Sequence, residues 1–267
     1  LPAAAILGAA PSPELASAAN LALYSAMVVF TIAMLLYAAY LAALGPDDRR
    51  REHERERERA AALVPVGAAS SVPEPVAVPT APAGPSLRAR KLAGSAFGMT
   101  CLATLVLVGS VVLRGLAVSR PPWGNMFEFA TAGATAAAVA YCLLARRNRW
   151  EWLGLFVVGP VLLTLGTALL AFYTEAAELM PALKSVWLVI HVVVAILAVG
   201  LFVIAFSVGV VYLVKARREA DPPARPSFVE TLPSAAALER TAYGLNMVGF
   251  ILWTFTLVAG AIWAQKA

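Results

Sequence analysis

Six long apolar runs dominate the sequence and limit what the chain can fold into. The runs cover residues 21–44, 93–118, 127–144, 152–173, 186–214 and 243–264. A helix needs about 20 apolar residues to cross the hydrocarbon core of a bilayer. The strands of a membrane β-barrel are shorter and alternate in polarity, which these runs do not. Because a helix satisfies its own backbone hydrogen bonds in lipid, the runs predict an all-α integral membrane protein, a bundle of about six transmembrane helices.

Composition agrees with a protein embedded in the lipid bilayer. Hydrophobic residues make up 60% of the chain and charged residues 14%, against about half and a quarter in soluble domains. Most of the 21 Lys and Arg residues fall in three alternate connectors, 45–91, 145–151 and 215–241. Basic loops stay in the cytoplasm, so we expect the N-terminus to lie outside. This topology explains the net charge of +5, and no nucleic-acid-binding module accompanies it, so no nucleic acid is expected as a partner.

The chain divides into three predicted parts. Residues 1–44 form an outer segment and the first transmembrane helix, and 45–91 form a cytoplasmic linker. Residues 92–267 form a five-helix membrane domain. In the linker, mixed charges at 47–59 favour an extension of the first helix, and the Pro/Ala-rich tract that follows is typical of a flexible connector. His53 has no other His or Cys nearby, which indicates a solvated residue rather than a metal ligand.

One polar stretch, "SRPPWGNMFEF" at residues 119–129, lies at the predicted outer turn between the second and third helices. Its prolines and glycine favour a turn, and Asn125 is a plausible N-cap of the third helix. Glu128 then stands at the third helical position, where its carboxylate can return a hydrogen bond to the cap. Capping alone leaves the aromatic residues around the acid, such as Trp123, unexplained, although aromatic anchors are common at membrane interfaces.

His191 is the one histidine within a predicted span. It lies within about 9 Å of the outer boundary, and Trp187 precedes it by one helical turn on the same face. An ionisable residue at this depth indicates function, and the alternative is a histidine that bonds a neighbouring helix. A neutral imidazole is a good axial ligand for iron, and aromatic neighbours suit a flat macrocycle. The sequence supplies no obvious second ligand.

Familiar catalytic motifs are missing from the sequence. Cys101 and Cys142 lie inside predicted helices without metal-type spacing. No nucleotide-binding, dinucleotide-binding or common hydrolase motif occurs. We therefore predict no catalytic residue in this chain. Besides a ligand-binding role for His191, two other classes of protein stay open. One is a small-molecule transporter whose outer vestibule contains His191, and the other is a structural membrane subunit. The scarcity of intramembrane charges besides Arg114 argues against transport.

Several segments together resemble a known family. In order, they are "LRGLAVSRPPWGNMFEF", "WLGLFVVGPVLLTLG", "PALKSVWLVIHVVVAILAVGLF", "LPSAAALERTAYG" and "ILWTFTLVAGAIWA". They resemble the haem-handling subunit of the system II cytochrome c biogenesis machinery, of the CcsA/ResC type, called CcsB in actinobacteria. The resemblance covers nearly the whole chain outside the linker.

The resemblance implies a function, a ligand and partners. Members present haem b at the outer face of the cell (plasma) membrane for attachment to the CxxCH cysteines of apocytochrome c. They act with a membrane partner of the CcsB/ResB type, so this chain would be a subunit of a holocytochrome c synthase complex and not catalytic alone. His191 matches the first of two haem-ligating histidines that flank the family's tryptophan-rich WWD segment, and is thus the expected metal ligand.

Four other residues are expected around that haem, namely Trp187, Trp123, Asn125 and Glu128. The last two match a polar outer loop that the family keeps beside the haem cavity, and we expect them to line or brace it. The sequence stops before the tryptophan-rich segment and begins with Leu1 rather than Met. We therefore expect the chain to be C-terminally truncated, with half of a haem site.

Overall fold

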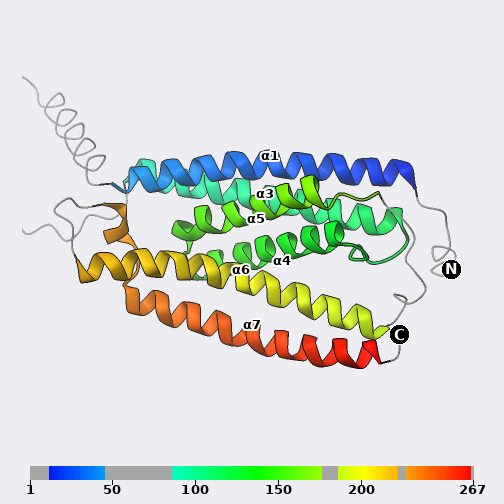
Figure 1. Cartoon of the computed structure of the whole chain (residues 1–267). Coiled ribbons are helices and arrows are strands. Elements are labelled where there is room, and N and C mark those ends of the chain that lie inside the picture. Colours follow the sequence, from blue (N-terminus) through cyan, green and yellow to red (C-terminus); the bar gives the residue numbers. More distant parts are fainter. Residues whose placement is uncertain (1–11, 46–85, 176–185, 222–226, 266–267) are drawn as a thin grey trace, which may run out of the picture.

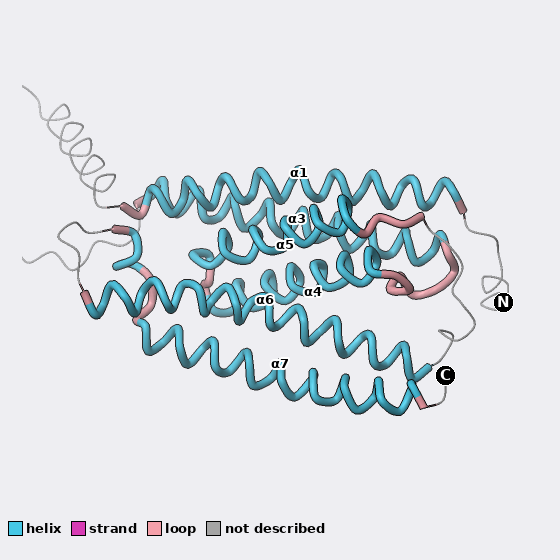
Figure 2. The backbone as a smooth tube through the Cα atoms, viewed as in Figure 1, coloured by secondary structure: helices cyan, strands magenta, loops and turns pink. Residues whose placement is uncertain are grey.

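The computed structural model describes residues 12–45, 86–175, 186–221 and 227–265, and within these ranges it contains helices but no strand (Figure 2). The long helices are α1 (Pro13–Ala43), α3 (Leu87–Ala117), α4 (Met126–Asn148), α5 (Gly154–Ala171), α6 (Val186–Ala220) and α7 (Ala235–Ala264). Two short 3-10 helices, η2 (Glu151–Leu153) and η4 (Phe228–Thr231), precede α5 and α7. Within the described ranges, six helices are long and apolar enough to cross a membrane. The predicted all-α, multi-span fold is confirmed.

The helices form three pairs, as Figure 1 shows. One side of the bundle is α1 packed on α3, and the opposite side is α6 packed on α7, while α4 and α5 lie between them. Successive helices run in opposite directions, so α1, α4 and α6 begin at the end where α3, α5 and α7 finish. We call this the outer end, after its predicted orientation, and the opposite end the inner end.

Some helix boundaries differ from the apolar runs. α6 continues beyond residue 214 to Ala220, and α7 already begins at Ala235. The predicted connector 215–241 was therefore too long at both of its ends. The Ser234 hydroxyl accepts a hydrogen bond from the backbone N–H of Ala237, which caps α7 before its apolar part starts. The predicted helical extension at 47–59 and His53 lie outside the described residues.

Small residues allow the helices to approach closely, as is typical of membrane bundles. The clearest case is Gly154 at the start of α5, because a Cβ there would lie 2.1 Å from the Tyr37 ring of α1. The Tyr37 hydroxyl is in turn 3.1 Å from the hydroxyl of Tyr141 on α4. Both tyrosines are fully buried. This contact joins α1, α4 and α5 in the inner half of the bundle.

Candidate functional site

The predicted outer turn begins with a Schellman motif at the end of α3. The backbone N–H of Arg120 donates to the carbonyl of Gly115 at 3.1 Å, and that of Ser119 donates to Leu116 at 3.2 Å. Ser119 has a φ of 50°, the left-handed conformation that this motif requires. The chain therefore reverses sharply after α3. This turn brings Arg120 next to the first turn of α4.

The N-cap predicted for α4 is confirmed. The Asn125 side-chain oxygen accepts a hydrogen bond from the backbone N–H of Glu128 at 2.8 Å. The predicted return bond from the Glu128 carboxylate is displaced by one residue, because its Oε2 accepts from the N–H of Gly124 at 2.8 Å. The carboxylate thus holds the turn closed and lies at the positive end of the helix dipole.

Glu128 also forms a buried ion-pair cluster that the sequence reasoning missed. Its side chain is fully buried, at 0% exposure. Its Oε1 accepts from Arg114 Nε at 3.1 Å, and its Oε2 accepts from Arg120 Nη1 at 2.8 Å. The cluster thus places two arginines against one buried carboxylate. The signal in the sequence was Arg114 itself, since an arginine within a span needs an acidic or carbonyl partner.

Arg114 connects this cluster to a third helix. Its Nη2 donates to the carbonyl of Thr174, just beyond α5, at 2.6 Å. Its guanidinium also lies over the Phe127 ring, 4.7 Å from the ring centre. Within the described residues its Nη1 has no hydrogen-bond partner. The side chain is only 4% exposed, so its charge depends on Glu128 for compensation.

His191 lies near the outer end of α6 and faces α7. Its Nδ1 is 2.8 Å from the backbone carbonyl oxygen of Thr256. A carbonyl can only accept, so Nδ1 carries the proton and donates it. In the neutral imidazole Nε2 then keeps a free lone pair. The ring fits against α7 because residue 260 is glycine, where a Cβ would lie 2.7 Å from the His191 Cε1 atom.

Aromatic residues accompany this histidine. Trp187 lies one turn before His191 on α6 and is 40% exposed. Trp263 follows Thr256 by seven positions on α7, so both lie on the α7 face that meets His191. Its Nε1 is buried without a hydrogen-bond partner in the described parts of the chain. Trp123 lies in the outer turn and is partly buried.

The contacts therefore divide the predicted site residues into two groups. Asn125 and Glu128 belong to the cluster of α3, α4 and the turn between them. His191 and Trp187 belong to α6, and the hydrogen bond of His191 goes to α7. The Glu128 side chain is fully buried and braces the outer turn through its hydrogen bonds. Contact with haem stays a prediction for all of these residues.

The chemistry that His191 offers is that of a single axial ligand. Across the described ranges, no three His, Cys, Asp or Glu side chains gather where they could hold a metal. Haem iron already has its porphyrin ligands and needs only axial ones from the protein, for which histidine is common. An imidazole anchored through one nitrogen and free at the other meets that need.

These features are those of a multi-span membrane protein with a histidine presented at one end, and sequence comparison shows its family. Residues 123–267 match the family model described as Cytochrome C assembly protein. That match covers more than half of the chain, which therefore belongs to this family.

The chain is similar to several curated proteins, each named cytochrome c biogenesis protein CcsA. The protein of Synechococcus sp. (strain JA-3-3Ab) is 26% identical over 225 residues, 62% of this chain and 63% of its own length. That of Guillardia theta is 26% identical over 196 residues, 64% of this chain and 62% of its own. That of Gloeobacter violaceus is 26% identical over 231 residues, or 64% and 65%. The expected resemblance to the CcsA type is confirmed. The chain spans less than two thirds of these relatives.

Proposed function

We propose that this chain handles haem for cytochrome c assembly and presents it at the outer face of the plasma membrane, with His191 Nε2 as an axial ligand of the iron. One observation carries the proposal, the 2.8 Å hydrogen bond from Nδ1 to the Thr256 carbonyl. Histidines that bind metals usually donate their other ring N–H to a carbonyl or carboxylate, which fixes the ring and the tautomer. His191 has this arrangement.

The other residues support the ligand in distinct ways. Trp187 is 40% exposed one turn away, so its indole offers an apolar surface to the flat face of a macrocycle. Trp123 offers a second such surface from the outer turn. Asn125 and Glu128 hold that turn in place through the N-cap and the ion-pair cluster. Haem is here the substrate being delivered, and the protein residues bind and orient it.

The family and the CcsA relatives support a role in cytochrome c assembly, and we propose two partners for that role. These are apocytochrome c, whose CxxCH cysteines receive haem b, and a membrane partner of the CcsB/ResB type. The chain would then act as one subunit of a synthase complex. Its own contribution is to hold haem in a fixed orientation at the membrane surface while the cysteine thiols add to the vinyl groups.

The test is an absorption spectrum of the detergent-purified chain loaded with haem. We expect a Soret band in the wild type, its loss in His191→Ala, and its recovery when free imidazole is added to that variant. We also expect Gly260→Ala to weaken the band, because the new methyl group would displace the imidazole. The matched control is Gly244→Ala on the same helix, where a Cβ meets no atom within 4 Å. An unchanged Soret band in His191→Ala would overturn the proposal.

A further inference from the structure

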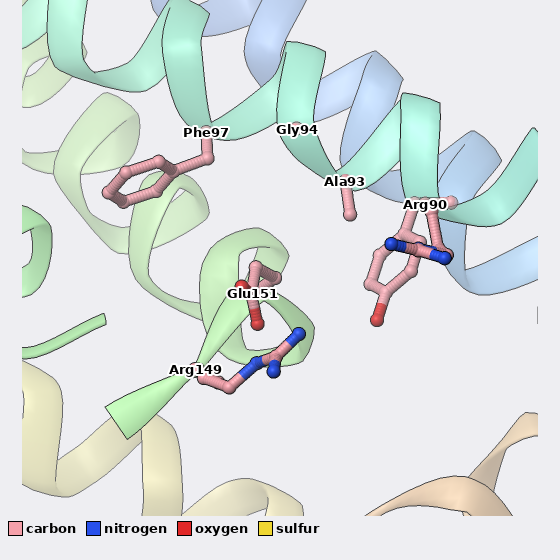
Figure 3. Close-up of a pocket in the computed structure, with 7 residues that line it drawn as sticks. Arg90, Ala93, Gly94, Phe97, Arg149 and Glu151 are labelled. Atoms are coloured by element: carbon pink, nitrogen blue, oxygen red, sulfur yellow. The ribbon is translucent and has the colours of Figure 1, made fainter. Parts of the chain in front are cut away.

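A separate cavity lies at the inner end of the bundle, at the opposite end from His191. It has a volume of about 210 Å³ and opens between α1, α3 and the turn from α4 to α5 (Figure 3). Its lining consists of Tyr40, Arg90, Ala93, Gly94, Phe97, Arg149 and Glu151. Nothing in the proposed haem chemistry uses this cavity.

Two arginines define the polar part of the cavity. Arg90 comes from the first turn of α3, and Arg149 follows the end of α4. Figure 3 shows the two guanidinium groups turned toward the same opening, with Glu151 beside Arg149. Neither guanidinium group forms a hydrogen bond or ion pair in the part of the chain that the structure describes. Two cations and one carboxylate leave the cavity with a net charge of +1.

The lining becomes apolar along α3. Ala93, Gly94 and Phe97 follow Arg90 at spacings of three, four and seven residues, so all four share one helix face. This stripe extends about 10 Å along the helix axis, toward the middle of the membrane. The space over Gly94 is open, because a Cβ there would meet no atom within 4 Å.

We propose that this cavity binds the headgroup of an inner-leaflet phospholipid. Arg90 and Arg149 hold the phosphate diester, for which guanidinium groups are suited. The glycerol backbone and the start of an acyl chain follow the apolar stripe over Gly94. Glu151 accepts a hydrogen bond from a donor in the headgroup, the ammonium of ethanolamine or a hydroxyl of glycerol. Phosphatidylethanolamine and phosphatidylglycerol therefore fit the site, whereas the choline headgroup offers no such donor.

Size and position favour a lipid over haem. Cavities that enclose drug-sized ligands measure about 300–1,000 Å³, and this one is smaller, at about 210 Å³. A headgroup fits that space, and a haem macrocycle does not. The cavity also lies at the end of the bundle that carries the basic connectors, where anionic headgroups gather.

Native mass spectrometry of the delipidated full chain in detergent tests the proposal. The chain is titrated with phosphatidylethanolamine, phosphatidylglycerol or phosphatidylcholine, and bound lipid is counted. We expect the double variant Arg90→Gln/Arg149→Gln to bind the first two lipids at least tenfold more weakly than the wild type. The matched control, Arg146→Gln/Arg147→Gln, removes two charges from the last turn of α4 outside the cavity and should bind as the wild type does. Equal losses in both double variants would overturn the proposal.

Two further variants separate a lipid site from a general anion site. Gly94→Leu fills the apolar groove without removing charge, and we expect it to bind lipid at least tenfold more weakly. Gly109→Leu is its control on α3, again at a position with open space. Glu151→Gln should reduce the preference for phosphatidylethanolamine over phosphatidylcholine. Unchanged lipid binding by Gly94→Leu, or displacement of the lipid by glycerol phosphate or haem at equal concentration, would contradict the assignment.

Discussion

The ion-pair cluster at the outer turn gives the sharpest prediction for stability. Glu128→Gln keeps the size of the side chain and one acceptor oxygen but removes the negative charge. Arg114 and Arg120, whose side chains are 4% and 11% exposed, then both lose their ion pair with this carboxylate. The amide N–H₂ of the glutamine also faces guanidinium and backbone N–H groups, which donate hydrogen bonds and cannot accept them. Removing one partner of a buried ion pair costs about 3–5 kcal/mol, and we expect a loss of stability in this range.

The assay is unfolding in mixed detergent, followed by circular dichroism as the denaturing detergent is increased. The matched control is Glu230→Gln, which removes a carboxylate that lies 3.4 Å from Arg218 at the inner end. These two side chains are 43% and 35% exposed, so the substitution should cost no more than about 1 kcal/mol. Equal midpoints for the two variants would refute the view that Glu128 compensates buried cations.

A double-mutant cycle extends this test to the contact itself. Arg114→Gln in the Glu128→Gln background should cost less than Arg114→Gln in the wild type, because the uncompensated charge is removed. Pairs in direct contact couple by about 0.5–3 kcal/mol. Additive effects of the two substitutions would contradict the direct contact.

Three further predictions concern the inner half of the bundle. Gly154→Ala should destabilise the protein by about 1–3 kcal/mol in the same assay, because its methyl group overlaps the Tyr37 ring. Arg149→Gly should stabilise the lipid-free protein by about 1 kcal/mol, since Arg149 has a φ of 56°. Burial alone would raise the pKa of Glu230, but hydrogen bonds, first that from the Ser227 backbone, lower it below its ordinary value. Its ionised carboxylate therefore stabilises η4 above that ordinary pKa. The protection factors of the η4 amides, which correct the exchange rates for the intrinsic effect of pH, should fall as the pH falls through the lowered pKa.

The sequence was sufficient to predict the six helices, because an apolar run of sufficient length has few alternatives in a bilayer. It was less accurate at the helix ends, as α7 shows. The first turns of that helix contain Glu239 and Arg240 and project beyond the apolar run. A search for hydrophobic segments omits such turns, although the cap at Ser234 marks the true start.

The candidate site was predicted in part, for a physical reason. The cap at Asn125 depends on local spacing and could be read from the sequence. The pairing of Glu128 with Arg114 depends on how the turn after α3 folds back, which spacing alone does not give. The contact of His191 with Thr256 uses a backbone carbonyl, and every residue has one. No residue type at position 256 could have revealed it.

A ligand exchange at His191 tests the central proposal most directly. His191→Cys replaces the imidazole by a thiolate, which also binds haem iron but gives a different spectrum. We expect the haem-loaded variant, reduced and exposed to carbon monoxide, to show the red-shifted Soret band of thiolate ligation, whereas the wild type shows that of histidine ligation. Identical spectra for the two proteins would contradict the assignment of His191 as an axial ligand.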